Sequence, residues 1–142
     1  MRIAGIIFVA FFAISPFSAF ATALNAGFVQ GLWYADEKIF ADVPTRIYVA
    51  FRNNTEDDLT GTIHFSVDGV RVGSSDVRAL SGRVVEAWVD WTPTFGDHAI
   101  VATVENVAQH RIGGAVIPAD VTGLMAEDSR SIDRDTDKDA TG

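Results

Sequence analysis

The amino-acid sequence predicts an all-β fold, an antiparallel β-sandwich of about seven strands. Three observations lead to this prediction. Short apolar segments recur along the middle of the chain, apolar and polar residues alternate within them, and residues typical of turns separate them. β-Branched residues are frequent in these segments, and none of the segments has the spacing of an amphipathic helix.

The expected strands, in order along the chain, are residues 28–34, 46–52, 62–67, 70–72, 84–91, 98–104 and 115–117. In the second of them, Ile47, Val49 and Phe51 alternate with other side chains, so these three are expected to face the core. The pair Asp68-Gly69 joins the third and fourth strands. This pair is the strongest short-range signal of a hairpin, because a type I′ turn needs positive φ at both central residues.

The fifth expected strand places its two tryptophans on opposite faces. Trp91 alternates in phase with Val89 and Ala87, so it is expected in the core. Trp88 falls on the other face with Glu86 and is the candidate for an exposed surface contact. Exposed aromatic rings also permit an alternative function, a carbohydrate-binding module. That alternative requires two or more coplanar, exposed rings on one face of a sheet.

Residues 1–23 predict a helical secretory signal peptide. Arg2 supplies a positive charge, residues 3–14 are uninterruptedly apolar, and Ala-Phe-Ala at 19–21 and Ala-Thr-Ala at 21–23 provide overlapping cleavage sites. An uncleaved membrane anchor is the alternative, but Pro16 interrupts the apolar segment before the length of about 20 residues that a membrane span needs. We therefore expect an extracellular or cell-surface protein. It would contact a membrane only through an uncleaved signal or a C-terminal anchor missing from this sequence.

The composition excludes several classes of function. The chain has 11 Lys and Arg against 19 Asp and Glu, a net charge of −8, so it lacks the basic surface that nucleic acids require. It has no cysteine, which excludes disulfides and cysteine catalysis. His64, His98 and His110 lack the spacing of a zinc site, and no Gly-x-Ser-x-Gly motif is present. We therefore predict that the protein is not an enzyme.

A pattern of residues between Gly27 and Val104 is similar to a known family. It consists of Asn53 at the end of a strand, Asp68-Gly69 followed by Val72-Gly73, Leu80-Ser81-Gly82, and the series Trp91-x-Pro93-x-x-Gly96-x-His98-x-Ile100-x-Ala102-x-Val104. The pattern resembles the immunoglobulin-like CARDB modules of exported bacterial surface proteins. The resemblance implies an immunoglobulin-like sandwich over residues 24–122. It also implies an adhesion or spacer role without catalysis, with protein partners or cell-envelope components. The family continues into a final edge strand, whereas residues 105–111 are only weakly strand-like here.

Residues 123–142 are expected to form a disordered acidic linker, because Ile132 is the only large apolar residue from Ala126 onward. Asp133, Asp135, Asp137 and Asp139 alternate in this segment. Calcium takes about six to eight oxygen ligands, so the four carboxylates are a candidate calcium site. Their spacing resembles the first half of a thrombospondin type 3 calcium repeat. A plain acidic linker without a bound ion is the alternative.

Overall fold

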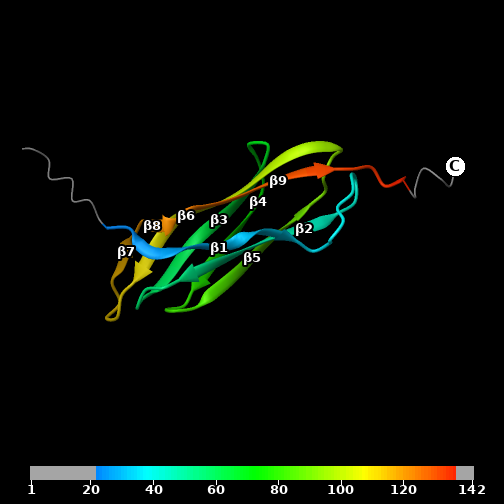
Figure 1. Cartoon of the computed structure of the whole chain (residues 1–142). Coiled ribbons are helices and arrows are strands. Elements are labelled where there is room, and N and C mark those ends of the chain that lie inside the picture. Colours follow the sequence, from blue (N-terminus) through cyan, green and yellow to red (C-terminus); the bar gives the residue numbers. More distant parts are fainter. Residues whose placement is uncertain (1–21, 137–142) are drawn as a thin grey trace, which may run out of the picture.

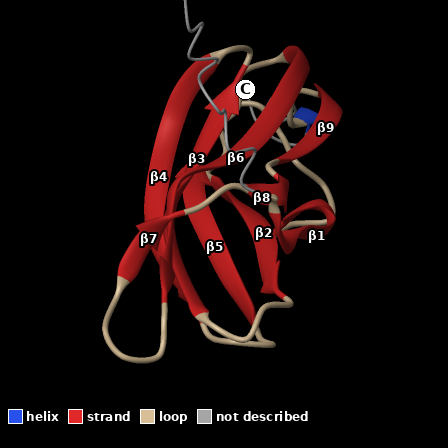
Figure 2. Cartoon of the chain, turned by 90° about the vertical axis from the view of Figure 1, so that its left-hand side faces the viewer, coloured by secondary structure: helices blue, strands red, loops and turns tan. Residues whose placement is uncertain are grey.

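The computed structural model describes residues 22–136, which form a sandwich of two packed β-sheets (Figure 1). Strands make up almost all of this part of the chain (Figure 2). They are β1 (Leu24–Tyr34), β2 (Thr45–Asn53), β3 (Asp58–Val67), β4 (Val70–Ala79), β5 (Val84–Trp91), β6 (Gly96–His110), β7 (Val116–Pro118), β8 (Val121–Gly123) and β9 (Met125–Ile132). The predicted all-β sandwich is confirmed.

The first sheet has the strand order β5-β2-β1-β8, and the second has β4-β3-β6 with both β7 and β9 paired to β6. All pairs are antiparallel except β1 with β8, which are parallel. The long strand β6 pairs with β9 along its first half and with β7 near its end. It therefore carries two successive partners on one edge.

The core lies between the sheets and is filled by the inward rows that the alternation predicts. Ile47, Val49 and Phe51 of β2 are almost fully buried, as are Ile63 and Phe65 of β3 opposite them. Trp91 is also buried, so its predicted place in the core is confirmed. Asp68 and Gly69 have φ values of 51° and 80°, which confirms the positive φ expected at both positions of the β3–β4 turn.

The structure corrects the prediction for the C-terminal segment. The prediction of a disordered linker from residue 123 is wrong for β9, which pairs with β6 over eight residues and buries Ala126 and Ile132. The alternate positions between them hold Asp128, which is half-buried, and Arg130, which is exposed, and the polarity of both hid the alternation. The segment forms a strand through its backbone pairing with β6. Tyr34 bonds the side chain of Asp128, which in turn bonds Arg130.

The last predicted strands are also shifted. The weakly strand-like residues 105–110 continue β6, and Val107 within them is buried. The expected strand 115–117 is β7, which is not the last strand, because β8 and β9 follow it. Asp137 and Asp139 lie outside the described residues. So does the predicted signal peptide at 1–23, except for its last two residues. Within residues 22–136, no helix is long and apolar enough to cross a membrane.

Candidate functional site

A row of three aromatic side chains crosses the outer face of the first sheet. Trp33 of β1 lies opposite Tyr48 of β2, and Tyr48 lies opposite Trp88 of β5. The rings of Trp33 and Tyr48 are stacked, with centroids 5.6 Å apart and planes within 8° of parallel. Trp88 is 45% exposed, and the other two are half-buried. These three residues are called the aromatic row below.

Strand alternation explains why the row faces outward. Tyr48 lies between the buried residues Ile47 and Val49, and Trp88 follows the buried Ala87. The register of β1 shifts between Val29 and Trp33, where Gln30 has a φ of 61°. This bulge brings Trp33 into line with Tyr48. The three strands therefore present one continuous row of rings to solvent.

Arg46 and Asp90 flank the row at one end. The Nε of Arg46 donates a hydrogen bond to Oδ1 of Asp90 at 2.8 Å, and its guanidinium carbon lies 3.8 Å from the centre of the Trp88 ring. The bond to Asp90 and a weaker one to Tyr48 raise the pKa of Arg46 above its ordinary value. The guanidinium thus joins an ion pair with a cation–π contact and holds the indole in place.

The exposure of Trp88 agrees with the sequence alternation. The sequence offers Trp33 and Tyr48 as further candidate surface aromatics, but it does not place them beside Trp88. Tyr48 and Trp33 belong to other strands, and their position beside Trp88 depends on the strand order β5-β2-β1. Tyr48 alternates with Ile47 and Val49, so its outward direction was available from the sequence. A functional contact at Trp88 stays a prediction.

A second polar cluster closes one end of the sandwich. Nδ1 of His98 lies 2.6 Å from Oδ2 of Asp68, and Nε2 lies 2.8 Å from the carbonyl oxygen of Thr94. The ring also meets Trp91 edge to face, with centroids 6.1 Å apart. Both nitrogens face acceptors, so both carry protons when the two bonds are made. Hydrogen bonds to Asp68 and Thr94 accordingly raise the pKa of His98.

This geometry does not suit His98 for general base catalysis. A carbonyl oxygen only accepts hydrogen bonds, so the Nε2 that faces Thr94 is a donor. The hydroxyl of Thr94 lies farther away, at 3.2 Å from the same nitrogen. The histidine therefore joins the β3–β4 turn to the β5–β6 connection rather than activating a nucleophile.

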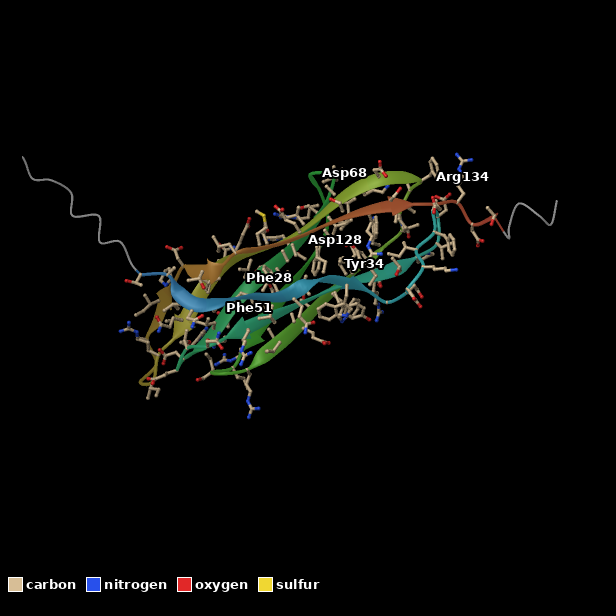
Figure 3. All side chains as sticks on the ribbon, in the orientation of Figure 1. Phe28, Tyr34, Phe51, Asp68, Asp128 and Arg134 are labelled. Carbon is tan, nitrogen blue, oxygen red and sulfur yellow. The ribbon has the colours of Figure 1, made fainter. Side chains whose placement is uncertain are left out.

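Tyr34 and Asp128 meet near the same end, from β1 and β9 (Figure 3). The hydroxyl of Tyr34 donates to Oδ2 of Asp128 at 2.9 Å, and Arg130 binds the same oxygen at 3.1 Å. The guanidinium of Arg130 lies 4.5 Å from the Tyr34 ring centre. Burial, and then the bond to Asp128, raise the pKa of Tyr34. These contacts give Asp128 and Arg130 of β9 their partners.

The candidate calcium residues are only partly described. Asp133 forms an isolated bridge with Phe40, and its carbonyl oxygen accepts a hydrogen bond from the backbone N of Ala41 at 2.9 Å. Within residues 22–136, no group of three His, Cys, Asp or Glu side chains converges on one point. Asp133 and Asp135 alone do not make up the oxygen cage that calcium requires. Asp137 and Asp139 lie outside the described residues.

The sequence matches no family model and no curated protein. The fold is similar to the CARDB domain of the PF1109 protein of Pyrococcus furiosus, whose crystal structure is a complex with di-metal ions. That structure has a TM-score of 0.61 and 14% identity, over 78% of this chain and 94% of that domain. A solution NMR structure of the same domain gives 0.57 and 14%, over 79% and 99%. At this identity the likeness shows the fold alone: the chain is a CARDB-like β-sandwich.

Proposed function

We propose that this chain is a non-catalytic module of the cell surface, which spaces or presents other parts of a surface protein. One observation carries the proposal. The described chain enters the elongated sandwich at one end, with β1, and leaves at the opposite end, after β9 (Figure 1). Segments attached at residues 24 and 136 would therefore be held apart by the length of the sandwich.

The pairing of the terminal strands supports this role. β1 is bonded to β2 from Ala26 to Tyr34, and β9 is bonded to β6 from Met125 to Ile132. A pull on the two ends acts along these strands, so it loads many hydrogen bonds at once rather than one after another. Such an arrangement suits a module that bears tension between neighbouring parts.

Export is part of the same proposal, and it rests on the signal peptide predicted at residues 1–23. Mass spectrometry of the chain secreted by a bacterial host tests it, and the expected product begins near residue 24. A product that retains Arg2 would instead support the uncleaved anchor. The proposed partners are proteins or cell-envelope components.

The spacing role can be tested with pairs of fluorophores, because the chain has no cysteine of its own. Cysteines introduced at Asn25 and Arg134 should lie at least about 35 Å apart, the length of an 11-residue strand such as β1. The control pair joins Arg134 to Phe95, whose side chains are in contact at 4.9 Å. Low energy transfer in the first pair and high transfer in the second are expected. High transfer in both would overturn the proposal.

A functional test follows on the cell. An epitope placed after the chain in a surface-displayed fusion should be reached by an antibody. Replacing the chain with a domain of equal size whose two ends lie together should reduce that access. If the antibody reached the epitope equally well in both fusions, the proposed spacing role would be contradicted.

Carbohydrate binding, the second candidate function, is supported by one exposed ring on this sheet face, that of Trp88. Trp33 and Tyr48 are half-buried and stack on each other, so they do not supply the second coplanar, exposed ring that this function requires. The two roles are compatible, because the row lies on the face of the sheet and leaves both ends of the sandwich free.

A further inference from the structure

We propose that β1 and the continuous segment β8–β9 form a mechanical clamp, which resists tension applied between the two ends of the module. The inference rests on the proposed spacing function and deepens it, since it names the contacts that carry the load. It draws on the direction of these strands, on the bonds between them and on the path of the chain from those bonds to each end.

The first strand of the described chain is bonded to the segment that leads to the last strand. β1 pairs in parallel with β8, with Leu24 opposite Val121 and Gly27 opposite Gly123. After β8 a single residue, Leu124, precedes β9. The N-terminal end of the described chain is therefore tied directly to the segment that leaves at the C-terminal end (Figure 1).

Tension on the two ends pulls β1 and β9 in opposite directions along their own axes, because the chain enters and leaves at opposite ends of the sandwich (Figure 1). β8 and β9 are already extended, so releasing β9 from β6 adds little length. The two ends can move apart only when β1 separates from β8 and β9. Since the strands slide past each other, the bonds that join them are loaded together.

Backbone contacts form the first part of the clamp. The backbone N of Leu24 donates to the carbonyl oxygen of Asp120 at 2.7 Å. The hydroxyl of Thr122 donates to the carbonyl oxygen of Ala26 at 3.2 Å. The facing glycines of β1 and β8 carry no side chains, which lets the two backbones meet closely between these bonds. All of these contacts oppose the sliding of β1 along β8.

A side-chain tie between β1 and β9 forms the second part. Tyr34 is the last residue of β1, and its hydroxyl donates to Oδ2 of Asp128 at 2.9 Å (Figure 3). The guanidinium carbon of Arg130, also in β9, lies 4.5 Å from the centre of the Tyr34 ring. A hydrogen bond to a carboxylate is stronger than one between neutral groups. Tyr34 and Asp128 move in opposite directions when the strands slide, so this bond must break.

The β3–β4 hairpin offers a matched comparison outside this path. β4 stands at the edge of the second sheet, paired with β3. The hydroxyl of Thr62 donates to Oδ1 of Asp76 at 2.8 Å, a hydroxyl-to-carboxylate bond like that of Tyr34. Force applied at Glu56 and Leu80, before β3 and after β4, peels β4 from β3 at one end. The bonds of the hairpin then break one pair after another.

Unfolding at constant force tests the inference on the full chain, made without export so that residue 23 is retained. The chain has no cysteine of its own, so DNA handles attach only where cysteines are introduced. Ala23→Cys with Thr136→Cys gives the terminal pull, and Glu56→Cys with Leu80→Cys gives the hairpin pull; all four positions are exposed. At the same force, the terminal pull should unfold the chain much more slowly, because the unfolding rate governs forced unfolding.

Two variants that each delete one hydroxyl locate the clamp. Tyr34→Phe should unfold about tenfold faster in the terminal pull, the effect of losing one hydrogen bond to a carboxylate, and at an unchanged rate in the hairpin pull. Thr62→Val should do the reverse. Thr122→Val removes the bond to Ala26 and should also speed unfolding in the terminal pull. Urea unfolding without force checks that each variant folds.

The outcomes separate the clamp from the spacing role. If Tyr34→Phe speeds unfolding equally in both pulls, Tyr34 only adds to general stability and the clamp is overturned. Slow unfolding in the terminal pull that neither Tyr34→Phe nor Thr122→Val changes would overturn the clamp but leave the tension to the pairing of β1 with β2 and of β9 with β6. Terminal unfolding as fast as hairpin unfolding would overturn the clamp and the bearing of tension together. The separation of the two ends is judged independently by the fluorophore pairs.

Discussion

Asp68 and His98 join two turns that lie far apart in the sequence. Asp68 begins the β3–β4 turn, and its two carboxylate oxygens bind Nδ1 of His98 at 2.6 Å and the backbone N of Ala99 at 2.9 Å. The other side of the imidazole reaches Thr94, in the connection that leaves β5. A single histidine thus joins the β3–β4 turn of the second sheet to the β5–β6 connection between the two sheets.

Stability should depend on pH through this pair. The bond to Asp68 raises the pKa of His98 above 6.5, and the bond to His98 lowers the pKa of Asp68 below 3.8. The stability that protonated His98 contributes is fully present below pH 6.5. It is lost as the pH rises through the pKa that His98 has in the folded protein. The stability that ionised Asp68 contributes is fully present above pH 3.8. It is lost as the pH falls through the pKa that Asp68 has in the folded protein. The pair therefore stabilises most between these two limits.

Urea unfolding of the wild type and of His98→Gln, measured from pH 4 to pH 9, checks this prediction. The difference in unfolding free energy should be largest below about pH 6.5 and should shrink as the pH rises. His110→Gln is the control, since the ring of His110 bonds the hydroxyl of Thr60 rather than a carboxylate. A difference that stays constant with pH would contradict the protonated pair.

Gly27→Ala should be strongly destabilising. A Cβ at this position would lie 2.4 Å from the Cα of Gly123, because β1 and β8 approach closely where they pair in parallel. Backbone atoms cannot move aside as a flexible side chain can, so we expect a loss of about 1–3 kcal/mol in urea unfolding. Gly31→Ala on the same strand is the matched control, since nothing lies within 4 Å of its added Cβ. An equal loss in both variants would refute the close approach.

The sequence predicted the strands that alternate cleanly and missed the one that does not. In β3, Ile63, Phe65 and Val67 alternate with polar residues, so period two was visible. In β9, the inward positions include Asp128, whose carboxylate is bonded by Arg130 two residues away and by Tyr34 across 94 positions of sequence. Such a long-range partner leaves no local pattern.

The candidate site was also predictable only in part, namely in the outward direction of Trp88. Alternation alone directs Trp88 outward from β5. The contact with Arg46 and the alignment with Tyr48 follow from the pairing of β2 with β5, which no local pattern specifies. The row as a surface therefore emerges only with the sheet topology.

Calcium binding by the segment after β9 stays a prediction that calorimetry can check. If the aspartates at 133, 135, 137 and 139 act as ligands, titration of the full chain with Ca²⁺ gives a saturable heat that Asp137→Asn abolishes. Asp76→Asn is the control, because Asp76 lies on β4, at the opposite edge of the same sheet from β9, where it accepts a hydrogen bond from Thr62 at 2.8 Å. Absence of heat in the wild type would support the plain acidic segment instead.

Asn53→Ala should be more destabilising than a surface change. Asn53 is fully buried, and its Nδ2 donates to the carbonyl oxygens of Asp57 at 2.7 Å and Ala79 at 2.9 Å. Its Oδ1 accepts from the backbone N and the hydroxyl of Thr55 at 2.9 and 2.7 Å. The alanine variant removes all four hydrogen bonds from a buried position, so we expect a loss of about 2–4 kcal/mol in urea unfolding.

A second variant distinguishes lost hydrogen bonds from lost volume at Asn53. Asn53→Asp keeps the shape and the acceptor oxygen but removes the donor and places a charge in the core. It should lower the unfolding free energy at least as much as alanine does at pH 7. Asn54→Ala, at an exposed neighbouring position, should change it by less than about 0.5 kcal/mol. Near wild-type stability of Asn53→Asp would show that the donor bonds to Asp57 and Ala79 do not hold the loop after β2.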